Sequence, residues 1–595
     1  MSQSVFHSYK QTVEKRGSRV AAQYKAEGTW RDVTWNEIDE VQQKASAALA
    51  KLGIKPKERV AIIANTRLEW AMADLAILGA GCVTIPVYQS NLPREVTYIL
   101  DDSNSVAVFA EDDSQLEKIR GEKKDGNLKD IRVVIAITGS VEGDEISWDD
   151  FLAMGEEHLK ENAEEVAALG LGLTKDDVLT YIYTSGTTGN PKGAILTHDC
   201  MLYEAEAIEE IGVLSPDELQ YLFLPLAHVF AKVLEVAWIS TGHTLAFWEG
   251  DQKKIVENLA EVRPTMMAAV PRIYEKIHAA IATKVENGEG IKGKLGRWAL
   301  AKGDEMARRE QAGGTAGGLG WALAQKLVYS KISGELKAKF GGRLRYFISG
   351  GAPLGRDIAY FYKYTDITIC EGYGLTETSA ASTILLPDDI RIGTVGRALP
   401  GTELKIANDG EILIRGRGVM KGYHGREDAT KECINDDGWF LTGDIGEIDK
   451  DGFLRITDRK KDIIVTAGGK NVAPQNIENT LKAKSPLIGQ VVVHGDKRKY
   501  LSALVVVDPD AVQAWASTNG LSGDYESLSQ KPELKKEIDG IVDTLNSSLA
   551  KYETLKKIYI LNHDFEIGNQ LTPTLKVKRK ACNEQYKEIF DGFYE

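Results

Sequence analysis

Short apolar runs alternate with longer amphipathic stretches along the first third of the chain. Residues 34–53 place apolar side chains at three- and four-residue steps, with Thr34 positioned to cap a helix and Gly53 to end it. A second helix is predicted at 69–78. Strands are predicted at 59–64, 82–87, 106–110, 133–137 and 178–183. This order of strands and helices predicts a parallel sheet with crossover helices, the α/β class.

Residues 280–340 are predicted to form helices, interrupted by a glycine-rich stretch at 313–318. An apolar stripe recurs there at four-residue steps: Val328, Ile332, Leu336 and Phe340. Lysines accompany it at positions 326, 331, 337 and 339. Two interpretations stay open: a helical insert packed on the main domain with a solvated basic face, or a peripheral membrane-contact surface.

The last third of the chain has a different pattern. Residues 393–422 are rich in glycine and short apolar runs, as in a small β-subdomain. Strands are predicted after it at 489–493, 501–507 and 557–561, and helices at 510–517 and 535–549. This mixture predicts a small α+β domain at the C-terminal end.

Composition narrows the class of protein. A length of 595 residues predicts two or more domains, and a net charge of −14 argues against a nucleic-acid surface. Five scattered cysteines exclude a metal-ligand spacing and favour a reducing compartment. The first residues lack a signal-peptide core, and Asp74 breaks the longest apolar stretch, so we expect a cytoplasmic protein.

Residues 184–193 carry the strongest chemical signal. Thr-Ser-Gly-Thr-Thr-Gly-Asn-Pro-Lys-Gly combines four hydroxyl side chains, three glycines and one lysine directly after a predicted strand. Glycines let backbone N–H groups approach an anion, and hydroxyls and a lysine add donors, so the loop is suited to phosphate. It is not a Walker A loop, because a proline precedes Lys192 and a glycine follows it.

With its flanking tyrosine and alanine, this loop resembles the phosphate-binding signature of the acyl-adenylate-forming enzymes, which include acyl-CoA synthetases, peptide-synthetase adenylation domains and luciferases. Further motifs resemble the family's in type and order: 224–230, 344–354, 371–378, 439–444, 458–462 and 571–580. The form Leu-Pro-Leu-Ala-His-Val-Phe at 224–230 and the long insert are most similar to the long-chain fatty acyl-CoA synthetases.

The resemblance implies a nucleotide site. Tyr373 would lie on the purine, Thr376 would reach the α-phosphate, and Asp444 would bind the ribose hydroxyls. Glu377 with Thr184 would hold Mg²⁺. The implied ATP-binding residues are Thr184, Ser185, Gly186, Thr187, Thr188, Gly189, Lys192, Gly350, Gly351, Ala352, Glu371, Gly372, Tyr373, Gly374, Thr376, Asp444 and Arg459.

The resemblance also implies the catalytic groups and the domain boundary. The catalytic lysine aligns with Lys576, where Leu575 replaces a common glycine and Lys578 stays an alternative; Thr184, Glu377 and His228 would assist. The domains would be an α/β unit at 1–458, with parallel-rich sheets and a β-subdomain, and a mobile α+β unit at 459–595, joined at hinge Lys461. Gly468, Gly469 and Lys470 would form the loop for the coenzyme A step.

The implied reaction activates a long-chain fatty acid with ATP to acyl-AMP and pyrophosphate, then transfers the acyl group to coenzyme A and releases AMP. The short 379–393 connection leaves no room for the insertion typical of fatty acyl-AMP ligases, which favours coenzyme A as acceptor. The alternatives are a ligase for another carboxylic acid or a carrier-protein acceptor, and a catalytically silent nucleotide-binding regulator. In a long-chain enzyme, the 280–340 insert could contact the inner membrane face where fatty acid enters.

Overall fold

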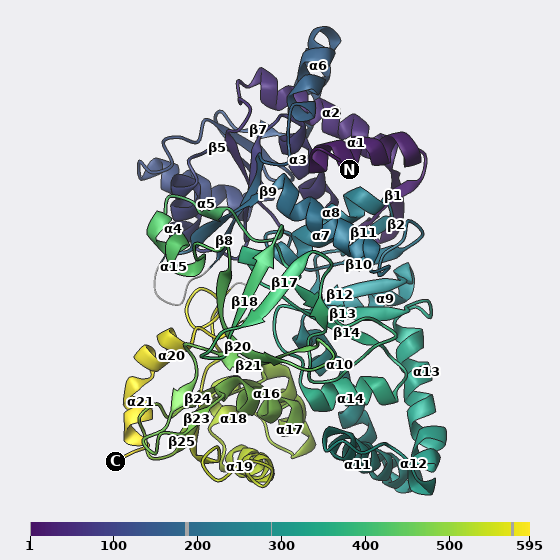
Figure 1. Cartoon of the computed structure of the whole chain (residues 1–595), viewed down its shortest axis with the longest axis vertical. Helices are drawn as coiled ribbons and strands as arrows, with labels where there is room; N and C mark the ends of the chain where they lie inside the picture. The colour runs from purple at the N-terminus through teal and green to yellow at the C-terminus, as the bar shows by residue number, and fades with distance from the viewer. Residues whose placement is uncertain (1, 185–189, 287, 573–575) are drawn as a thin grey trace.

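The computed structural model describes residues 2–184, 190–286, 288–572 and 576–595. Two large sheets and one smaller antiparallel sheet build the part of the chain up to Arg459, and a three-stranded sheet builds the part that follows it (Figure 1). The predicted loop residues Ser185, Gly186, Thr187, Thr188 and Gly189 lie outside the described residues.

The first large sheet has eight strands in the order β19-β9-β8-β4-β3-β5-β6-β7. Their bounds are β3 Arg59–Ile63, β4 Val83–Val87, β5 Ser105–Ala110, β6 Val133–Ala136, β7 Ile146–Ser147, β8 Val178–Thr184, β9 Lys192–Thr197 and β19 Gly422–Tyr423. Strands β3 to β8 pair in parallel, whereas β9 returns antiparallel to β8. The strands predicted from apolar runs are therefore confirmed.

Six helices of the first third of the chain pack with this sheet. They are α1 Val5–Arg16, α2 Trp35–Lys51, α3 Leu68–Gly79, α4 Pro93–Asp102, α5 Asp113–Lys124 and α6 Trp148–Leu171. Thr34 and Glu37 form a reciprocal capping box at the start of α2, and Gly53 adopts a left-handed φ of 75° just beyond its end. Both predicted ends of this helix are thus observed.

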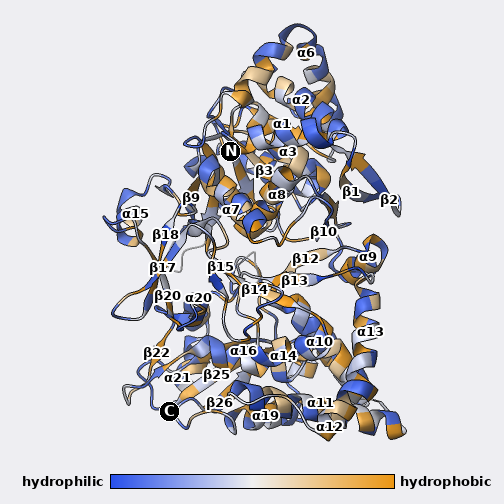
Figure 2. Ribbon diagram, turned by 45° about the vertical axis from the view of Figure 1, so that its right-hand side comes forward, coloured by the Kyte–Doolittle hydropathy of each residue, from blue (hydrophilic) through white to orange (hydrophobic). Residues whose placement is uncertain are grey.

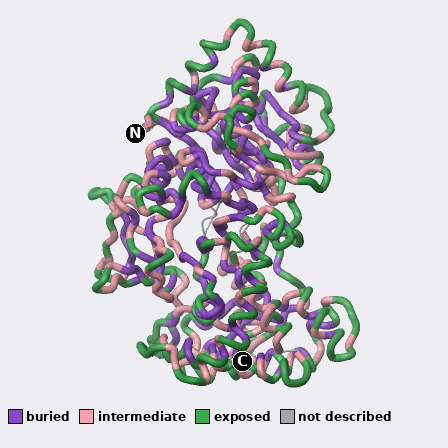
Figure 3. The backbone as a smooth tube through the Cα atoms, turned by 90° about the vertical axis from the view of Figure 1, so that its right-hand side faces the viewer, coloured by how far each residue is buried: buried purple, intermediate pink, exposed green. Residues whose placement is uncertain are grey.

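The second large sheet has nine strands in the order β16-β15-β14-β13-β12-β10-β11-β1-β2. Their bounds are β1 Val20–Ala26, β2 Thr29–Thr34, β10 Leu219–Leu222, β11 Thr244–Phe247, β12 Met266–Ala269, β13 Tyr346–Ser349, β14 Ile369–Tyr373, β15 Thr383–Ile384 and β16 Arg397–Ala398. One hydrophobic core joins this sheet to the first through α7 His198–Glu210 and α8 Val229–Thr241. Figure 3 shows the buried backbone concentrated in these layers.

The β-subdomain is larger than the predicted 393–422 segment. Its antiparallel sheet contains β17 Thr402–Ile406, β18 Glu411–Gly416, β20 Phe440–Ile448 and β21 Leu454–Arg459. Beyond it, β24 Ile488–His494, β25 Leu501–Val507 and β26 Leu555–Ile560 form the C-terminal sheet, with its own hydrophobic clusters. The remaining elements there are β22 Ile464–Val465, β23 Asn471–Val472, α16 Pro474–Lys484, α17 Pro509–Thr518, α18 Tyr525–Ser529, α19 Pro532–Asn546, α20 Arg579–Gln585 and α21 Lys587–Gly592. The predicted α/β and α+β combination is confirmed.

A helical segment projects beside the C-terminal sheet (Figures 1 and 2). It comprises α10 Pro271–Glu286, α11 Gly290–Gln311, α12 Leu319–Ala324, a π-helical turn at Gln325–Tyr329 and α13 Ser330–Lys339, and it lies against α14 Arg356–Tyr364. The predicted stripe of Val328, Ile332, Leu336 and Phe340 is buried in the main core. That stripe therefore does not face a membrane, because packing against the domain has covered it.

Two short helices complete the main part: α9 Ile255–Val262 and α15 Glu427–Cys433. Within the described ranges, no helix has the length and apolar character needed to cross a membrane.

Candidate active site

A cavity of about 3840 Å³ lies between the large sheets, the β-subdomain and the C-terminal part of the chain. Most of the predicted site residues line it, although they come from distant parts of the sequence. Those residues are Thr184, Lys192, His228, Gly350, Gly351, Ala352, Glu371, Gly372, Tyr373, Gly374, Thr376, Glu377, Asp444, Arg459, Lys461 and Lys576.

The β8–β9 hairpin presents the two described ends of the phosphate-type loop. Thr184 ends β8, Lys192 begins β9, and the antiparallel register sets these residues opposite each other. The Thr184 hydroxyl donates to the Lys192 carbonyl at 3.5 Å. A hydroxyl and an ammonium group thus start from one rigid strand pair at the cavity wall, which suits an anionic ligand.

Tyr423 is a site residue that sequence reasoning missed. Its hydroxyl donates to Glu377 Oε1 at 2.7 Å, and Lys192 Nζ lies 5.0 Å from the centroid of its ring. Strand β19 carries it there by pairing with β9, which sets Tyr423 opposite Ala194. One tyrosine therefore orients the predicted metal-binding carboxylate while it packs against the predicted phosphate-binding lysine.

Tyr373 and Asp444 form a second cluster with Arg459. The Tyr373 hydroxyl donates to Asp444 Oδ2 at 2.7 Å, and Arg459 Nε lies 3.1 Å from Asp444 Oδ1. Strands β20 and β21 pair Asp444 directly with Arg459, which explains the contact. Burial raises the pKa of the Asp444 carboxyl, whereas Arg459 and the Tyr373 hydroxyl oppose that rise. The cluster presents carboxylate, phenol and guanidinium together.

The turn after Tyr373 tolerates no side chain at Gly374. A Cβ built there would lie 1.5 Å from the Ala380 carbonyl oxygen. Ser379 and Ala380 themselves have left-handed φ angles of 60° and 97°. This tight turn holds Thr376 and Glu377 at the cavity wall.

Glu371 lies on β14 just before that turn. Burial raises the pKa of its carboxyl to about 8, against a smaller opposing effect of the Leu354 N–H donor. Burial therefore favours the protonated carboxyl, which could donate a hydrogen bond into the cavity.

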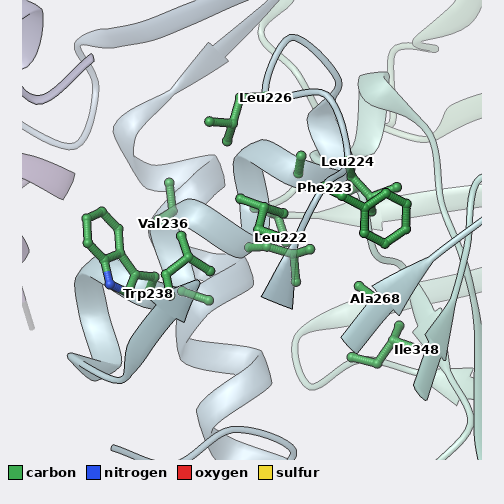
Figure 4. Packing of buried hydrophobic residues seen from close by; sticks show 14 of the residues in the cluster. Leu222, Phe223, Leu224, Leu226, Val236, Trp238, Ala268 and Ile348 are labelled. Atoms are coloured by element: carbon green, nitrogen blue, oxygen red, sulfur yellow. The ribbon is translucent and has the colours of Figure 1, made fainter. Parts of the chain in front are cut away.

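His228 is the N-cap residue of α8 and lines the cavity. Its Nδ1 accepts from the Phe230 N–H at 3.1 Å, so the ring caps its own helix. Burial, with a further effect of the positive Lys576, lowers the pKa of His228 to about 3. The imidazole is therefore neutral at physiological pH. Val236 and Trp238 of the same helix are buried in the hydrophobic core (Figure 4).

Lys576 comes from the C-terminal part of the chain and reaches the same cavity. Its side chain is accessible to the cavity but enclosed by protein, and this desolvation lowers its pKa to about 8, with Arg459 adding to the effect and Asp444 and Glu377 opposing it. The alternative, Lys578, donates instead to the Gly568 carbonyl at 2.9 Å. The geometry favours Lys576 as the lysine that meets a ligand.

The predicted coenzyme A loop lies elsewhere. Gly468, Gly469 and Lys470 connect β22 to β23, are exposed, and do not line the cavity. Lys461 is exposed in the connection after β21 and does line it. Arg272 at the start of α10 forms an ion pair with Asp508 of the C-terminal part at 2.8 Å, which fastens the two parts in this arrangement.

A magnesium ion fits the donor set only together with a ligand's phosphates. The described residues contain no cluster of three or more histidine, cysteine or acidic side chains suited to a metal. Thr184 and the oriented Glu377 carboxylate both line the cavity, and Mg²⁺ characteristically takes one or two carboxylates plus substrate phosphates. These two residues would hold the ion.

Comparison with known protein families shows which family this chain belongs to. Residues 9–424 match the AMP-binding enzyme family, and residues 461–595 match the AMP-binding enzyme C-terminal domain. The chain belongs to the AMP-binding enzyme family. The resemblance to acyl-adenylate-forming enzymes is therefore confirmed.

This AMP-binding enzyme is similar in sequence to long-chain-fatty-acid–CoA ligases along almost its whole length. It is 39% identical over 579 residues to the long-chain-fatty-acid–CoA ligase FadD15 of Mycobacterium bovis, covering 96% of this chain and 93% of that protein. It is 30% identical to the long-chain-fatty-acid–CoA ligase ACSBG2 of Xenopus laevis, covering 100% and 84%.

Solved structures of low identity share the fold. The anthranilate CoA ligase AuaEII, solved with anthranoyl-AMP, superposes with a TM-score of 0.74 at 19% identity, covering 99% of this chain and 98% of that one. The adenylation domain of a Mycobacterium chelonae carboxylate reductase gives 0.75 at 20% identity, covering 99% and 91%.

Proposed function

We propose that this AMP-binding enzyme converts a long-chain fatty acid, ATP and coenzyme A into acyl-CoA, AMP and pyrophosphate. The observation that carries the proposal is the meeting of Lys576 and His228 in one cavity with the Asp444–Arg459 pair. The names of relatives at 39% and 30% identity support the substrate class.

The first step joins two anions, so positive charge and donors must gather where they meet. Lys576 would lie between the fatty-acid carboxylate and the α-phosphate, while the neutral His228 packs beside the carboxylate. A carboxylate oxygen attacks the α-phosphorus, and the bond to pyrophosphate breaks. Lys192 would bind the departing phosphates. Mg²⁺, held by Thr184 and Glu377, would neutralise phosphate charge.

The nucleoside would occupy the side of the cavity lined by β14 and β20. Tyr373 would offer its ring to the adenine, and the Asp444 carboxylate, fixed by Tyr373 and Arg459, would accept from the ribose hydroxyls. Gly350, Gly351 and Ala352 follow β13, line the cavity and would lie beside the nucleotide.

Apolar side chains form part of the cavity lining, which supports a long-chain acid over a small aryl acid. A Cβ at Gly350 would lie 3.2 Å from the Phe230 ring, so glycine leaves the passage beside that ring open. The apolar lining residues around α8 and its neighbouring strands are Phe223, Val229, Phe230, Val233, Leu234 and Trp248.

The second step needs a different arrangement. The thiolate of coenzyme A attacks the acyl carbon, and the bond between that carbon and the AMP oxygen breaks. Because Lys576 lines the cavity and the 468–470 loop does not, residues 459–595 would turn about Lys461 relative to residues 1–458 before this step. This proposal includes a domain boundary at 458 and a hinge at Lys461.

The test is product analysis by mass spectrometry with ATP, Mg²⁺ and coenzyme A over straight-chain acids from short to very long, plus an aryl acid. Long-chain acyl-CoA with release of AMP is expected. Acyl-AMP without acyl-CoA would indicate a carrier-protein acceptor, and aryl-CoA alone would indicate another acid. No turnover of any acid would favour a nucleotide-binding regulator.

A further inference from the structure

The helix that runs from α12 into α13 has two apolar faces, and only one is packed. The inner face, with Ala324, Val328 and Ile332, is buried in the core. The outer face repeats leucine at the same four-residue step: Leu319 is 88% exposed, Leu323 51% and Leu327 39%. Packing against the main domain covers the first face, whereas the second face stays largely exposed within the described residues.

Such exposure is unusual in this protein. Among the described residues, Leu319 and Ile291 (85%) are the most exposed large hydrophobic side chains, and both lie in this helical segment. Ile291 lies in the first turn of α11, the helix that packs against α12. Isolated exposed leucines need no explanation, but a helical row of three marks a contact surface.

The charges beside this row identify the kind of partner. Lys326 and Lys331 are exposed on the same helix, and neither forms an ion pair within the described ranges. Residues 290–340 contain ten lysines and arginines against four acidic residues, although the whole chain carries a net charge of −14. A local positive field with apolar side chains between the cations suits a surface that is anionic outside and apolar beneath.

The same helical segment reaches the cavity from its inner side. Gly303 and Ala307 of α11 line the cavity together with Tyr329. A Cβ on Gly303 would lie 1.9 Å from the Tyr329 hydroxyl oxygen, so α11 and the π-helical turn are in close contact there. The outer leucine row and the cavity wall therefore belong to one packed unit.

We propose that Leu319, Leu323 and Leu327, flanked by Lys326 and Lys331, form a docking face for an anionic phospholipid membrane. The leucines enter the boundary between headgroups and acyl chains, and the lysines meet the phosphates. This face is distinct from the buried stripe that the sequence suggested. The inference rests on the proposed function for its purpose, because long-chain fatty acids partition into bilayers; the binding itself requires no catalysis.

The first experiment is co-sedimentation of the full chain with phosphatidylcholine vesicles containing phosphatidylglycerol, without ATP or coenzyme A. The variant Leu319→Glu/Leu323→Glu/Leu327→Glu should lose on the order of tenfold or more in vesicle affinity. Lys326→Gln/Lys331→Gln should lose on the order of tenfold on anionic vesicles and little on pure phosphatidylcholine. The matched control is Val141→Glu/Leu171→Glu, two exposed apolar residues outside the segment, which should bind as wild type.

Thermal unfolding of each variant should match wild type, because the substituted side chains are exposed. Absence of vesicle binding by the wild-type protein, or equal binding by wild type and the leucine variant, would overturn the proposal. So would a wild-type dimer in sedimentation velocity that the leucine variant converts to monomer, since the face would then join two copies of the chain.

Activity assays distinguish a failure of the docking face from a failure of the proposed function. The leucine variant should keep wild-type turnover with a fatty acid short enough to dissolve in water and lose about tenfold in kcat/KM when a long-chain acid is supplied within vesicles. Face-dependent vesicle binding without turnover of any acid would refute the proposed function and leave the docking face standing. Equal turnover of vesicle-borne acid by both proteins would refute a role of the face in substrate delivery.

Discussion

The charge on Lys576 is the most consequential property at the scale of single residues. Desolvation lowers its pKa to about 8, so the ammonium form that the first step needs is lost as pH rises through that value. We expect kcat/KM for ATP–pyrophosphate exchange to fall about tenfold per pH unit above pH 8. Lys576→Arg should remove that alkaline limb, because a guanidinium stays charged, while lowering the plateau.

A flat wild-type profile between pH 7 and pH 10 would show that no positive charge on Lys576 is required. The alkaline decline is expected in kcat/KM, because kcat/KM reports the ionisation of groups in the free enzyme. In the complex with ATP, the triphosphate should raise the lysine pKa, so the corresponding limb in kcat should lie at higher pH.

Tyr423 offers a second test at this scale. Tyr423→Phe removes the hydroxyl that orients Glu377 but keeps the ring against Lys192. We expect acyl-AMP formation to fall about tenfold, with a higher Mg²⁺ concentration needed for half-maximal rate. Tyr559→Phe, an exposed tyrosine in the C-terminal sheet, is the matched control and should behave as wild type. An unchanged magnesium dependence in Tyr423→Phe would remove this residue from the site.

Residues within motifs could be named as candidates from the sequence, whereas Tyr423 was missed. Lys192, Glu377 and Asp444 stand in recognisable patterns, and the structure brings them to one cavity. Tyr423 stands in an ordinary Gly-Tyr-His-Gly turn, and its position depends on the pairing of β19 with β9. No local signal in the sequence reports a pairing over such a separation.

At the scale of elements, α8 contains a buried charge cluster one turn after His228. Lys232 Nζ lies 2.5 Å from Asp74 Oδ2 on α3 and 2.8 Å from Glu235 Oε2, and all three side chains are buried. Lys232→Met would leave two carboxyl groups buried without their cation. We expect a loss of about 3–5 kcal/mol in the free energy of unfolding.

Chemical denaturation of the N-terminal part measures that loss. The matched control is Lys254→Met, which removes a more exposed ion pair with Glu249 and should cost under about 1 kcal/mol. Equal effects of the two substitutions would contradict a structural role for the buried cluster.

Apolar periodicity identified most strands and helices, because burial of one face is a local property of the sequence. Apolar periodicity was insufficient for the helix from α12 to α13. The stripe beginning at Val328 was recognised, but the sequence did not distinguish a face packed on the core from a second one left in solvent. Only the position of the neighbouring helices separates them.

At the scale of the whole molecule, the Arg272–Asp508 ion pair joins the two parts that the proposed second step would move relative to each other. Asp508→Asn keeps the cap of α17 but removes the charge. We expect acyl-AMP formation to slow by about twofold to fivefold and thioester formation from supplied acyl-AMP to stay unchanged or rise. Single-turnover measurements of each step give the ratio.

Arg272→Met should change that ratio in the same direction, and the double variant should add little. Arg498→Met, which breaks an ion pair with Asp591 inside the C-terminal part, is the control and should leave the ratio unchanged. Equal slowing of both steps by Asp508→Asn would contradict a fastening role. The sequence contained no sign of this contact, because it depends on how two separately cored parts meet.

In the proposed mechanism, Lys576 acts in the first step and leaves the site in the second. The most direct test is Lys576→Ala assayed separately for ATP–pyrophosphate exchange and for acyl-CoA formation from supplied long-chain acyl-AMP. We expect ATP–pyrophosphate exchange to fall by at least about a hundredfold, while acyl transfer to coenzyme A stays within about threefold of wild type. Equal loss of both steps would contradict it.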